Sequence, residues 1–232
     1  MFHNIQDGAI FIADAHYSKK RQKLKKLLIK IKQGDIKVSQ LFLMGDIFDF
    51  LSAEIEYFNK INSEVIQLIN EISKKIEVIY LEGNHDYNLK EIFHNALVIP
   101  REKQPIQFNY KNKIIALAHG DIFTPKLYNF YTLIIRNSTL LKILNFIDIS
   151  NWLTSSIEKS LNKKEKNYKF LNFEEFAKDR IKKYEKIKSH IIIEGHFHQG
   201  KMYDKYINLP ALLEGGYLQL LQGEFVVIRK ML

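Results

Sequence analysis

The sequence predicts an α/β fold in one domain spanning residues 1–232. Two observations lead to this class. Short apolar runs alternate along the chain with longer amphipathic segments, as strands alternate with helices in α/β proteins. Five of the apolar runs are each followed by a block rich in Asp, Asn, Gly and His. Because sheet-based enzymes place their sites at the carboxyl ends of strands, these blocks are expected to meet in one site.

The predicted strands are short. The five that precede the polar blocks are residues 9–13, 41–44, 78–81, 114–118 and 191–193. Residues 107–117 are predicted to form a hairpin that turns at Lys111-Asn112. Residues 203–230 are predicted to form further short strands, with turns at Gly215-Gly216 and Gln222-Gly223.

The predicted helices lie between these strands. Apolar residues recur at helical spacing over residues 19–32 and again over residues 54–75. The segment 122–188 separates the last two polar blocks and has helical patterning, with more apolar surface than one narrow helix face requires. We therefore expect a helical cap over the site, inserted at about 122–188 and belonging to the same domain.

The five polar blocks carry all seven candidate metal ligands. They are Asp14-Ala15-His16, Gly45-Asp46-Ile47-Phe48-Asp49, Gly83-Asn84-His85-Asp86, His119-Gly120-Asp121 and Gly195-His196-Phe197-His198. Five of the eight histidines of the chain lie in these blocks. An isolated Asp-x-His pair is usually structural, and an isolated Gly-Asp-x-x-Asp commonly ends a strand. All five blocks in order, each after a predicted strand, indicate a binuclear metal site.

The residue types suit hydrolysis of a phosphate ester or anhydride, because two metal ions about 3.5–4 Å apart can clamp a phosphoryl group and activate water. Asp14 and His16 are two residues apart, so at an extended strand end their side chains share a face and can bind one ion. Asp46 can bridge both ions. Mixed N and O ligation without sulfur suits Mn²⁺, Fe²⁺ or Zn²⁺ more than Ca²⁺ or Cu⁺ and does not distinguish among the three. Mn²⁺ is the expected ion, with Fe²⁺ or Zn²⁺ as alternatives. The remaining predicted ligands are Asn84, His119 and His196 on the second ion, and His198 on the first.

Two residues are predicted to take part in the chemistry without binding metal. His85 directly follows Asn84 and is expected to face the open side of the site, where it could protonate the leaving group or stabilise phosphoryl oxygens. Asp49 is a candidate to hold His85 in the useful tautomer. Asp86 and Asp121 are expected to have structural roles, in a turn or a cap.

On these blocks the chain resembles the calcineurin-like metallophosphoesterases. The resemblance implies a four-layer α/β/β/α sandwich with two mixed sheets, the ligand roles given above, and a catalytic role for His85. Within that superfamily it most resembles the UDP-2,3-diacylglucosamine pyrophosphatases of lipid A synthesis, in its size, in Ala118-His119-Gly120-Asp121 and in the place of the insertion. The implied reaction releases UMP and diacylglucosamine 1-phosphate. The well-studied branch of those enzymes has Arg where this chain has His85.

The cap composition fits a diacylated substrate, which must bury two apolar chains while its pyrophosphate reaches the metals. The predicted substrate-binding residues of the cap are Arg136, Leu140, Leu144, Phe146, Trp152, Lys163 and Lys164. An apolar cap flanked by lysines also suits peripheral contact with an anionic membrane surface. The alternative is that these side chains pack only against each other and the sheet.

Bulk properties place further bounds on partners and location. A net charge of +9 favours anionic partners, although biased lysine usage is an equally simple explanation. The chain has no cysteine, which excludes disulfides and thiolate zinc sites and suits a reducing compartment. It shows no basic start followed by an apolar run. A cytoplasmic location is expected. Any peripheral membrane contact is expected on the cytoplasmic face of the inner membrane.

Three other functions remain open. A phosphodiesterase or nuclease would use the positive charge to neutralise backbone phosphates. However, the aromatic residues cluster in the apolar cap and are not interleaved with basic residues, so nucleic acid is not the expected partner. A non-catalytic scaffold of the same fold is disfavoured by the intact ligand set and by His85. A protein phosphatase would need a peptide groove that nothing in the sequence suggests. The sequence leaves the oligomeric state undetermined.

Overall fold

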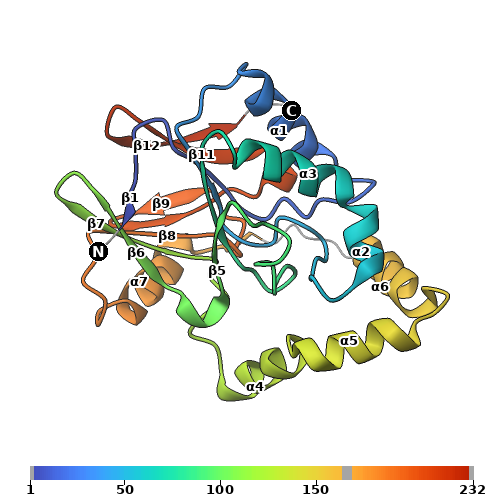
Figure 1. The fold of residues 1–232 in the computed structure, drawn as a ribbon. Helices are drawn as coiled ribbons and strands as arrows, with labels where there is room; N and C mark the ends of the chain where they lie inside the picture. The colour runs from blue at the N-terminus through green and yellow to red at the C-terminus, as the bar shows by residue number, and fades with distance from the viewer. Residues whose placement is uncertain (1–2, 164–168, 230–232) are drawn as a thin grey trace.

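The computed structural model describes residues 3–163 and 169–229. The strands form two six-stranded sheets (Figure 1). The first sheet has the order β1 (His3–Asn4), β6 (Ile106–Tyr110), β7 (Lys113–Ala118), β8 (Ile191–Glu194), β10 (Tyr206–Asn208) and β9 (Lys201–Tyr203). The second has the order β12 (Glu224–Arg229), β11 (Gly216–Leu221), β2 (Ile10–Ile12), β3 (Gln40–Leu43), β4 (Glu77–Leu81) and β5 (Leu97–Ile99). The five strands predicted to precede the polar blocks are therefore confirmed.

The second sheet separates two layers of the core. Along β2, Ile10 and Ile12 pack in a cluster with helices α1 (Lys23–Gln33) and α3 (Ser63–Ile72). Phe11 between them points to the opposite face and joins the cluster that lies between the two sheets. This alternation follows from the two-residue period of an extended strand. Helices thus cover the outer face of the second sheet.

The first sheet is covered on its outer face by α7 (Phe173–Lys183). Leu117 of β7 joins the cluster between the sheets, whereas Ala116 and Ala118 pack with Phe173 and Ala177 of α7. The molecule is a four-layer α/β/β/α sandwich, as the family resemblance implied.

Two predicted helices differ from the observed ones. The predicted helix over 54–75 is wrong as one element, because it breaks into α2 (Glu56–Ile61) and α3 at Asn62. Asn62 has φ −101° and ψ 2°, and its buried side chain donates to the Phe50 carbonyl at 3.3 Å. The predicted helix 19–32 begins only at Lys23. Before it, Ser18 and Arg21 exchange backbone hydrogen bonds in a turn.

The hairpins follow the sequence closely. β6 and β7 pair antiparallel around Lys111-Asn112, and β11 and β12 pair antiparallel around Gln222-Gly223. Gln222 and Gly223 both have positive φ, 53° and 91°, which matches the right-handed twist of the flanking strands. Gly215 ends a short 3-10 helix, η2 (Leu212–Glu214), and Gly216 already begins β11.

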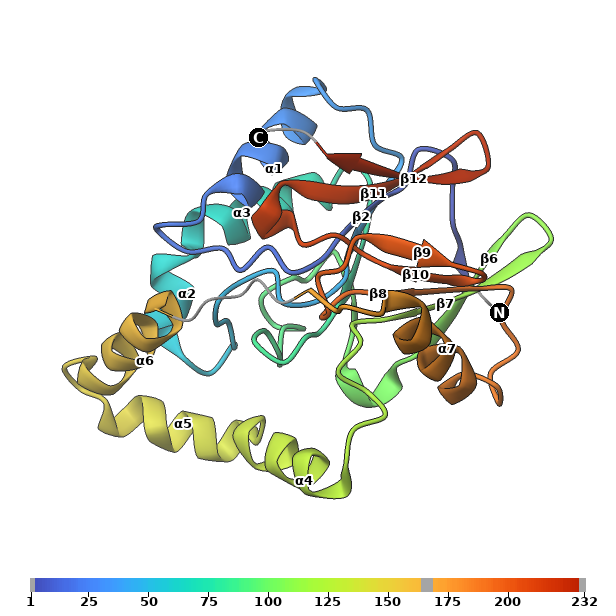
Figure 2. The same cartoon turned by 180° about the vertical axis from the view of Figure 1, so that it is seen from behind.

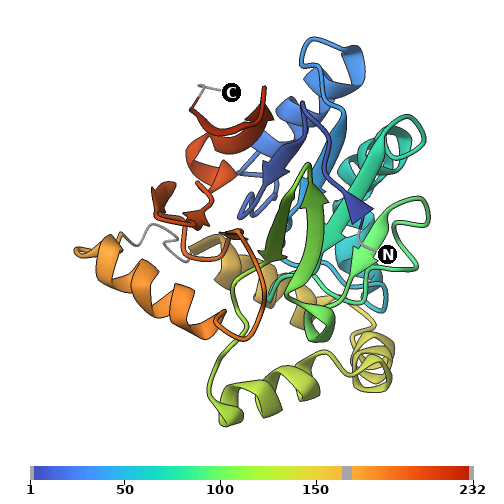
Figure 3. The same cartoon turned by 90° about the vertical axis from the view of Figure 1, so that its left-hand side faces the viewer.

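The insertion divides into two parts. Helices α4 (Lys126–Ile135), α5 (Ser138–Ile147) and α6 (Trp152–Lys163) extend away from the sheets, and we call these three helices the cap (Figures 1 and 2). In Figure 3, α7 (orange) lies apart from α4 (yellow-green). Because α7 packs on the first sheet, this part of the predicted 122–188 segment is the outer layer of the sandwich.

The far end of the cap rests on α2, which lies beside α6 in Figures 1 and 2. The Tyr57 hydroxyl of α2 donates to Glu158 Oε2 at 2.6 Å, and the Glu56 backbone N–H donates to Asn145 Oδ1 at 3.0 Å. Leu141 of α5 is buried in a small cluster with Phe58 of α2. The cap is therefore attached at this end as well as at α4.

Most of the exposed large hydrophobic side chains of the described residues belong to the cap region. Those on the three helices are Leu127, Phe130, Tyr131, Leu133, Ile134, Leu140, Ile143, Phe146, Ile147, Trp152 and Ile157. A surface this apolar is unusual for a protein that meets only water. Within the described part of the chain, the helices are too short or too polar for any of them to cross a membrane.

Candidate metal centre

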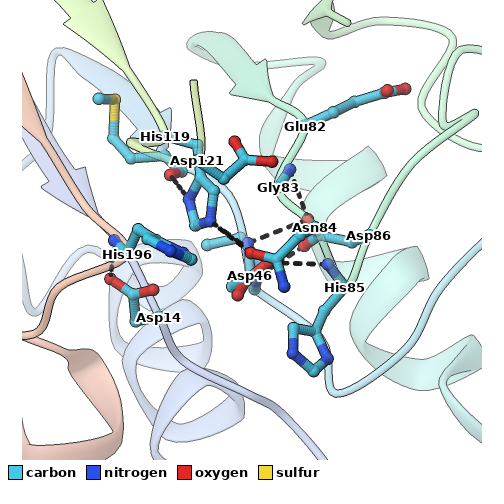
Figure 4. Close-up of polar contacts among 12 residues, drawn as sticks. Asp14, Asp46, Glu82, Gly83, Asn84, His85, Asp86, His119, Asp121 and His196 are labelled. Atoms are coloured by element: carbon cyan, nitrogen blue, oxygen red, sulfur yellow. Dashed lines mark hydrogen bonds and ion pairs between the residues drawn. The ribbon is translucent and has the colours of Figure 1, made fainter. Parts of the chain in front are cut away.

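The five polar blocks converge at one edge where the two sheets meet (Figure 4). Asp14 and Asp46 follow β2 and β3, which run parallel in the second sheet. His119 and His196 follow β7 and β8, which run parallel in the first sheet. The carboxyl ends of both sets of strands point to the same place, so residues far apart in sequence become neighbours. The predicted convergence is confirmed.

The ligand atoms fall into three overlapping groups, and within each group they lie within 4.8 Å of one another. The groups are Asp14, His16 and His198; His16, Asp46 and His85; and Asp46, His119 and His196. Asp46 belongs to two groups, as a bridging carboxylate would. Its Oδ1 lies 3.5 Å from His119 Nε2 and its Oδ2 lies 4.0 Å from His16 Nε2.

The donor set fits divalent ions. No hydrogen bond among the described residues reaches the buried Asp14 Oδ1, which lies 3.2 Å from His198 Nε2. Lone-pair donors gathered in this way, with only O and N atoms, suit Mn²⁺, Fe²⁺ or Zn²⁺. The groups thus supply possible ligands for divalent metal ions on both sides of Asp46.

The backbone conformation at the candidate ligands differs from the extended conformation that the sequence suggested. Asp14 and His16 have φ of 52° and 45°, so they do not continue the extended strand. The argument that alternation places both side chains on one face is therefore wrong, although the two do meet. Asp46, His196 and His198 also have positive φ, which is uncommon outside glycine and costs free energy. Loop backbone, not strand geometry, aims the ligands.

Charge coupling dominates the centre of the site. Burial opposes ionisation of Asp46, but the adjacent His119, His85 and His16 outweigh it and hold the pKa of Asp46 well below 3.8. Burial also opposes protonation of His119, but Asp46 and further carboxylates raise its pKa well above 6.5. His196 is different, because burial and the neighbouring His119 lower its pKa. A cation bound at this position would compete with protonation of His119.

Two candidate ligands, His119 and Asn84, lie close together, and the ring of His119 is oriented by its other nitrogen. His119 Nδ1 lies 2.9 Å from the Met44 carbonyl, which can only accept, so Nδ1 carries the proton and Nε2 faces the site. Asn84 Oδ1 lies 3.2 Å from His119 Nε2. A Cβ on Gly45 would lie 2.4 Å from His119 Nδ1, so this ring packs against backbone that only glycine allows.

His85 sits at the open side of the centre. Its backbone N–H donates to Asp46 Oδ1 at 2.9 Å, and its Nδ1 donates to the Asp49 carbonyl at 2.7 Å. The contact between these two predicted catalytic residues therefore uses the main chain of Asp49. The Asp49 carboxylate is paired with Arg21 and lies 3.6 Å from His16 Nδ1. Asp49 thus supports a metal ligand through its side chain and His85 through its carbonyl.

Asp86 joins two of the ligand blocks. Its carboxylate accepts hydrogen bonds from the backbone N–H groups of Asp46, Ile47 and Gly83, at 2.9, 2.6 and 2.9 Å. The Tyr80 hydroxyl donates to the same group at 2.7 Å. The expected structural role of Asp86 is confirmed. Its carboxylate holds the turn that begins at Gly83 and also the backbone at Asp46 and Ile47.

Sequence reasoning missed several residues that hold the blocks. Arg21 Nε donates to the His16 carbonyl at 2.9 Å and its Nη2 to Asp49. Gln104 accepts from the His119 backbone N–H at 2.7 Å and donates to the Glu82 carbonyl at 2.8 Å. Neither residue lies in a motif, so no spacing in the sequence could have indicated them.

The start of the cap is tied to the centre by two arginines. Arg101 Nε donates to Asp121 Oδ2 at 2.7 Å, and its Nη2 donates to Asn129 Oδ1 of α4 at 3.0 Å. Arg136 Nη2 donates to the Gly83 carbonyl, and its Nη1 lies 3.6 Å from Glu82. Asp121 is thus structural, as expected, and Arg136 joins α4 to the block that contains Asn84 and His85.

The other predicted cap residues are more exposed. Leu140, Phe146 and Trp152 are 37%, 82% and 63% exposed, and Leu144 is half-buried. Lys163 is exposed at the end of α6. Lys164 lies outside the described residues.

A sandwich of two sheets that gathers Asp, His and Asn donors at their shared edge is the framework of a metal-dependent phosphoesterase. The calcineurin-like phosphoesterase family matches residues 9–200, and the chain belongs to this family. It is a hydrolase.

Individual relatives match to different extents. The UDP-2,3-diacylglucosamine hydrolase of Histophilus somni (strain 129Pt) is 24% identical over 212 residues, which cover 89% of this chain and 91% of that protein. A protein of the same name from Neisseria meningitidis serogroup B is 30% identical over 88 residues, which cover 37% of this chain and 36% of that protein.

Similar solved structures include a phosphoesterase from E. coli, at 13% identity and a TM-score of 0.45, covering 95% of this chain and 98% of that one. Another is a dimetal phosphatase from Danio rerio, at 12% identity and a TM-score of 0.46, covering 96% of each chain.

Proposed function

We propose that the protein hydrolyses the pyrophosphate of UDP-2,3-diacylglucosamine and releases UMP and diacylglucosamine 1-phosphate. The observation that carries this proposal is the similarity to the Histophilus somni hydrolase over 89% of this chain and 91% of that protein. A match of that length takes in the cap. The relative acts, by its name, on a nucleotide-linked glycolipid.

In the proposed reaction the metal ions, when bound, polarise the phosphoryl group and activate water. The proposed metal preference is Mn²⁺, with Fe²⁺ or Zn²⁺ as alternatives. The residues that would hold the two ions are Asp14, His16, Asp46, Asn84, His119, His196 and His198. His85 would interact with the phosphoryl oxygens or donate a proton to the leaving group through Nε2, because its Nδ1 is bonded to the Asp49 carbonyl.

The cap would receive the acyl chains. Leu140, Leu144, Phe146 and Trp152 lie on α5 and α6, where apolar surface is exposed or half-buried and available to a lipid. Lys163 and Lys164 would add positive charge for the phosphate groups. Arg136 uses its guanidinium on Gly83 and Glu82, so its contribution would be to hold α4 beside His85.

The same surface would bring the enzyme to its substrate. The exposed apolar residues of α4 and α5 could enter the headgroup region of a bilayer, and the net charge of +9 would favour anionic lipids. We therefore propose peripheral contact on the cytoplasmic face of the inner membrane.

The test is a direct comparison of substrates. The Mn²⁺-loaded protein is incubated separately with UDP-2,3-diacylglucosamine, a dinucleotide polyphosphate and single-stranded DNA, and products are identified by mass spectrometry. We expect UMP and diacylglucosamine 1-phosphate from the first and little product from the others. Preferential cleavage of either alternative substrate would overturn the proposal.

One observation favours a second candidate, a phosphodiesterase acting on smaller nucleotides. His85 is the general phosphoesterase residue, where the well-studied branch of UDP-2,3-diacylglucosamine pyrophosphatases has Arg. A histidine can donate a proton to the leaving group of a substrate that carries no lipid. Faster turnover of the dinucleotide polyphosphate would select this candidate.

A further inference from the structure

Arg180 of α7 is a buried cation on the outer side of the first sheet, and the chemistry proposed above makes no use of it. Only 4% of the residue is exposed. Its Nε and Nη2 donate to the two carboxylate oxygens of Glu194 at 2.8 and 2.5 Å. The hydroxyls of Tyr184 and Tyr206 donate to the same carboxylate at 2.7 and 2.9 Å. The Glu194 carboxylate therefore accepts four hydrogen bonds inside the protein.

The guanidinium also reaches two of the metal-ligand blocks. Arg180 Nη2 donates to the Gly120 carbonyl at 3.2 Å, and Gly120 directly follows His119. The guanidinium carbon lies 5.1 Å from the centre of the Phe197 ring, and Phe197 stands between His196 and His198. A stacked cation of this kind is both an electrostatic and a packing contact.

These two blocks also touch each other. Gly120 has φ of 125°, and a Cβ there would lie 3.0 Å from His196 Cβ and 3.2 Å from the Phe197 ring. There is no spare room between the turn after His119 and the turn that carries His196. Arg180 lies against both turns, so its position limits how they can shift relative to one another.

A buried ion pair is seldom retained for stability alone, because desolvation of both charges offsets most of the attraction. Arginine suits this place because its planar fork can satisfy Glu194 bidentately and still donate to Gly120. Lysine has a single nitrogen and cannot make the same set of contacts.

We infer that Arg180 is a positioning residue for the metal centre, which fixes His119, His196 and His198 relative to one another from behind the first sheet. The inference rests on the metal-dependent hydrolase assigned above and not on the proposed lipid substrate. It gives α7 a role in the site, although this helix lies outside the cap and carries no metal ligand.

The test compares Arg180→Met and Arg180→Lys with the wild-type protein, and uses Lys178→Met as the matched control. Lys178 is on the same helix, but it is exposed and pairs with Glu174 at the surface. Folding is checked by circular dichroism. Mn²⁺ affinity of the metal-free proteins is measured by calorimetry, and kcat and KM are measured with bis(p-nitrophenyl) phosphate, which needs no acyl site.

We expect Arg180→Met to weaken at least one Mn²⁺ site by about 10- to 100-fold, the range seen when a residue supporting a ligand is lost. The kcat should fall by a similar factor at saturating Mn²⁺, with KM changed less than about threefold. Arg180→Lys should lie between the wild-type protein and Arg180→Met, and Lys178→Met should match the wild type.

Folded Arg180 variants with wild-type Mn²⁺ affinity and kcat would overturn the inference. If Arg180→Met does not fold, Arg180→Lys decides in the same way, because it keeps the charge that neutralises Glu194. A wrong lipid substrate leaves these measurements unchanged. Wild-type protein that bound no Mn²⁺ would overturn the inference and the metal centre together.

Discussion

Individual side chains of the candidate metal centre are oriented by contacts on the side that faces away from the centre. His119 is oriented by the Met44 carbonyl, and His16 lies against the Asp49 carboxylate that Arg21 holds. Such supporting contacts fix the tautomer and the ring direction before any cation arrives. Because these contacts connect the candidate ligands, we expect the loss of one ligand to weaken metal binding at both positions.

Asp46→Ala and His119→Ala should each lower kcat by more than about 100-fold, because each removes a ligand and not only its support. Asp46 stands between two groups of ligand atoms, so its loss affects both positions. Turnover of an aryl phosphodiester at saturating Mn²⁺ measures the effect. His94→Ala, at an exposed histidine outside the blocks, is the control. Undiminished activity in either ligand variant would refute the site assignment.

Metal affinity should rise with pH, because Mn²⁺ must displace a proton from His119. Burial opposes that proton, but Asp46 holds the pKa of His119 well above 6.5, so the competition should continue above pH 6.5. His196 has a lowered pKa and should compete little there. Calorimetric titrations between about pH 6 and 8.5 should show up to about a tenfold gain per pH unit for each proton displaced. An affinity independent of pH in this range would contradict the coupling.

At the scale of elements, local periodicity and long-range packing give different information. The strands before the blocks were predictable because apolar runs bounded by turn residues are a local signal. The break at Asn62 was not predictable. The residues around Asn62 have helical spacing in the sequence, and the side chain of Asn62 makes a tertiary contact with Phe50 where the helix is interrupted. Helix α7 falls within the segment 122–188 that was predicted to be helical, but only its packing on β7 and β8 distinguishes it from the cap.

The cap helices should contribute to binding of the lipid and not to the chemistry. Replacing Leu140, Leu144 and Phe146 together by Ala should raise KM for UDP-2,3-diacylglucosamine about tenfold, since each side chain loses apolar contact with acyl chains. KM for a soluble aryl phosphodiester should change little. The Phe146 substitution should also leave stability nearly unchanged, because this side chain is 82% exposed.

Steady-state kinetics on both substrates gives this comparison. Leu221→Ala, at an exposed leucine of β11 outside the cap, is the matched control. Equal effects of the triple variant on the two substrates would remove the acyl-binding role.

At the scale of the whole molecule, the apolar surface is concentrated on one side. Figures 1 and 2 show the cap below the sandwich and α1 on the opposite side of the sheets. A protein with this asymmetry has one side suited to an apolar interface and another suited to water. Such an arrangement agrees with an enzyme that takes its substrate from a membrane surface.

Vesicle binding tests this arrangement. Trp152→Ser combined with Ile149→Ser should weaken cosedimentation with vesicles containing anionic phospholipid by about tenfold or more, because both side chains are exposed and apolar. Added salt should weaken the wild-type interaction further, through screening of the positive charge. Kinetics with the aryl phosphodiester should be unaffected. Unchanged vesicle binding would show that the cap does not contact the membrane.

The class of fold, the reaction class and the meeting of the five blocks at one place were predictable from the chain alone, because strand periodicity and the order of the blocks are local features. How the side chains of these blocks are oriented and supported depends on the tertiary structure. Arg21, Gln104 and Arg180 act across the fold through buried hydrogen bonds, and no spacing encodes such contacts. The positive φ of Asp14 and His16 is likewise imposed by the surrounding loops. The contribution of α7 likewise depends on its packing against the first sheet, which is a long-range contact.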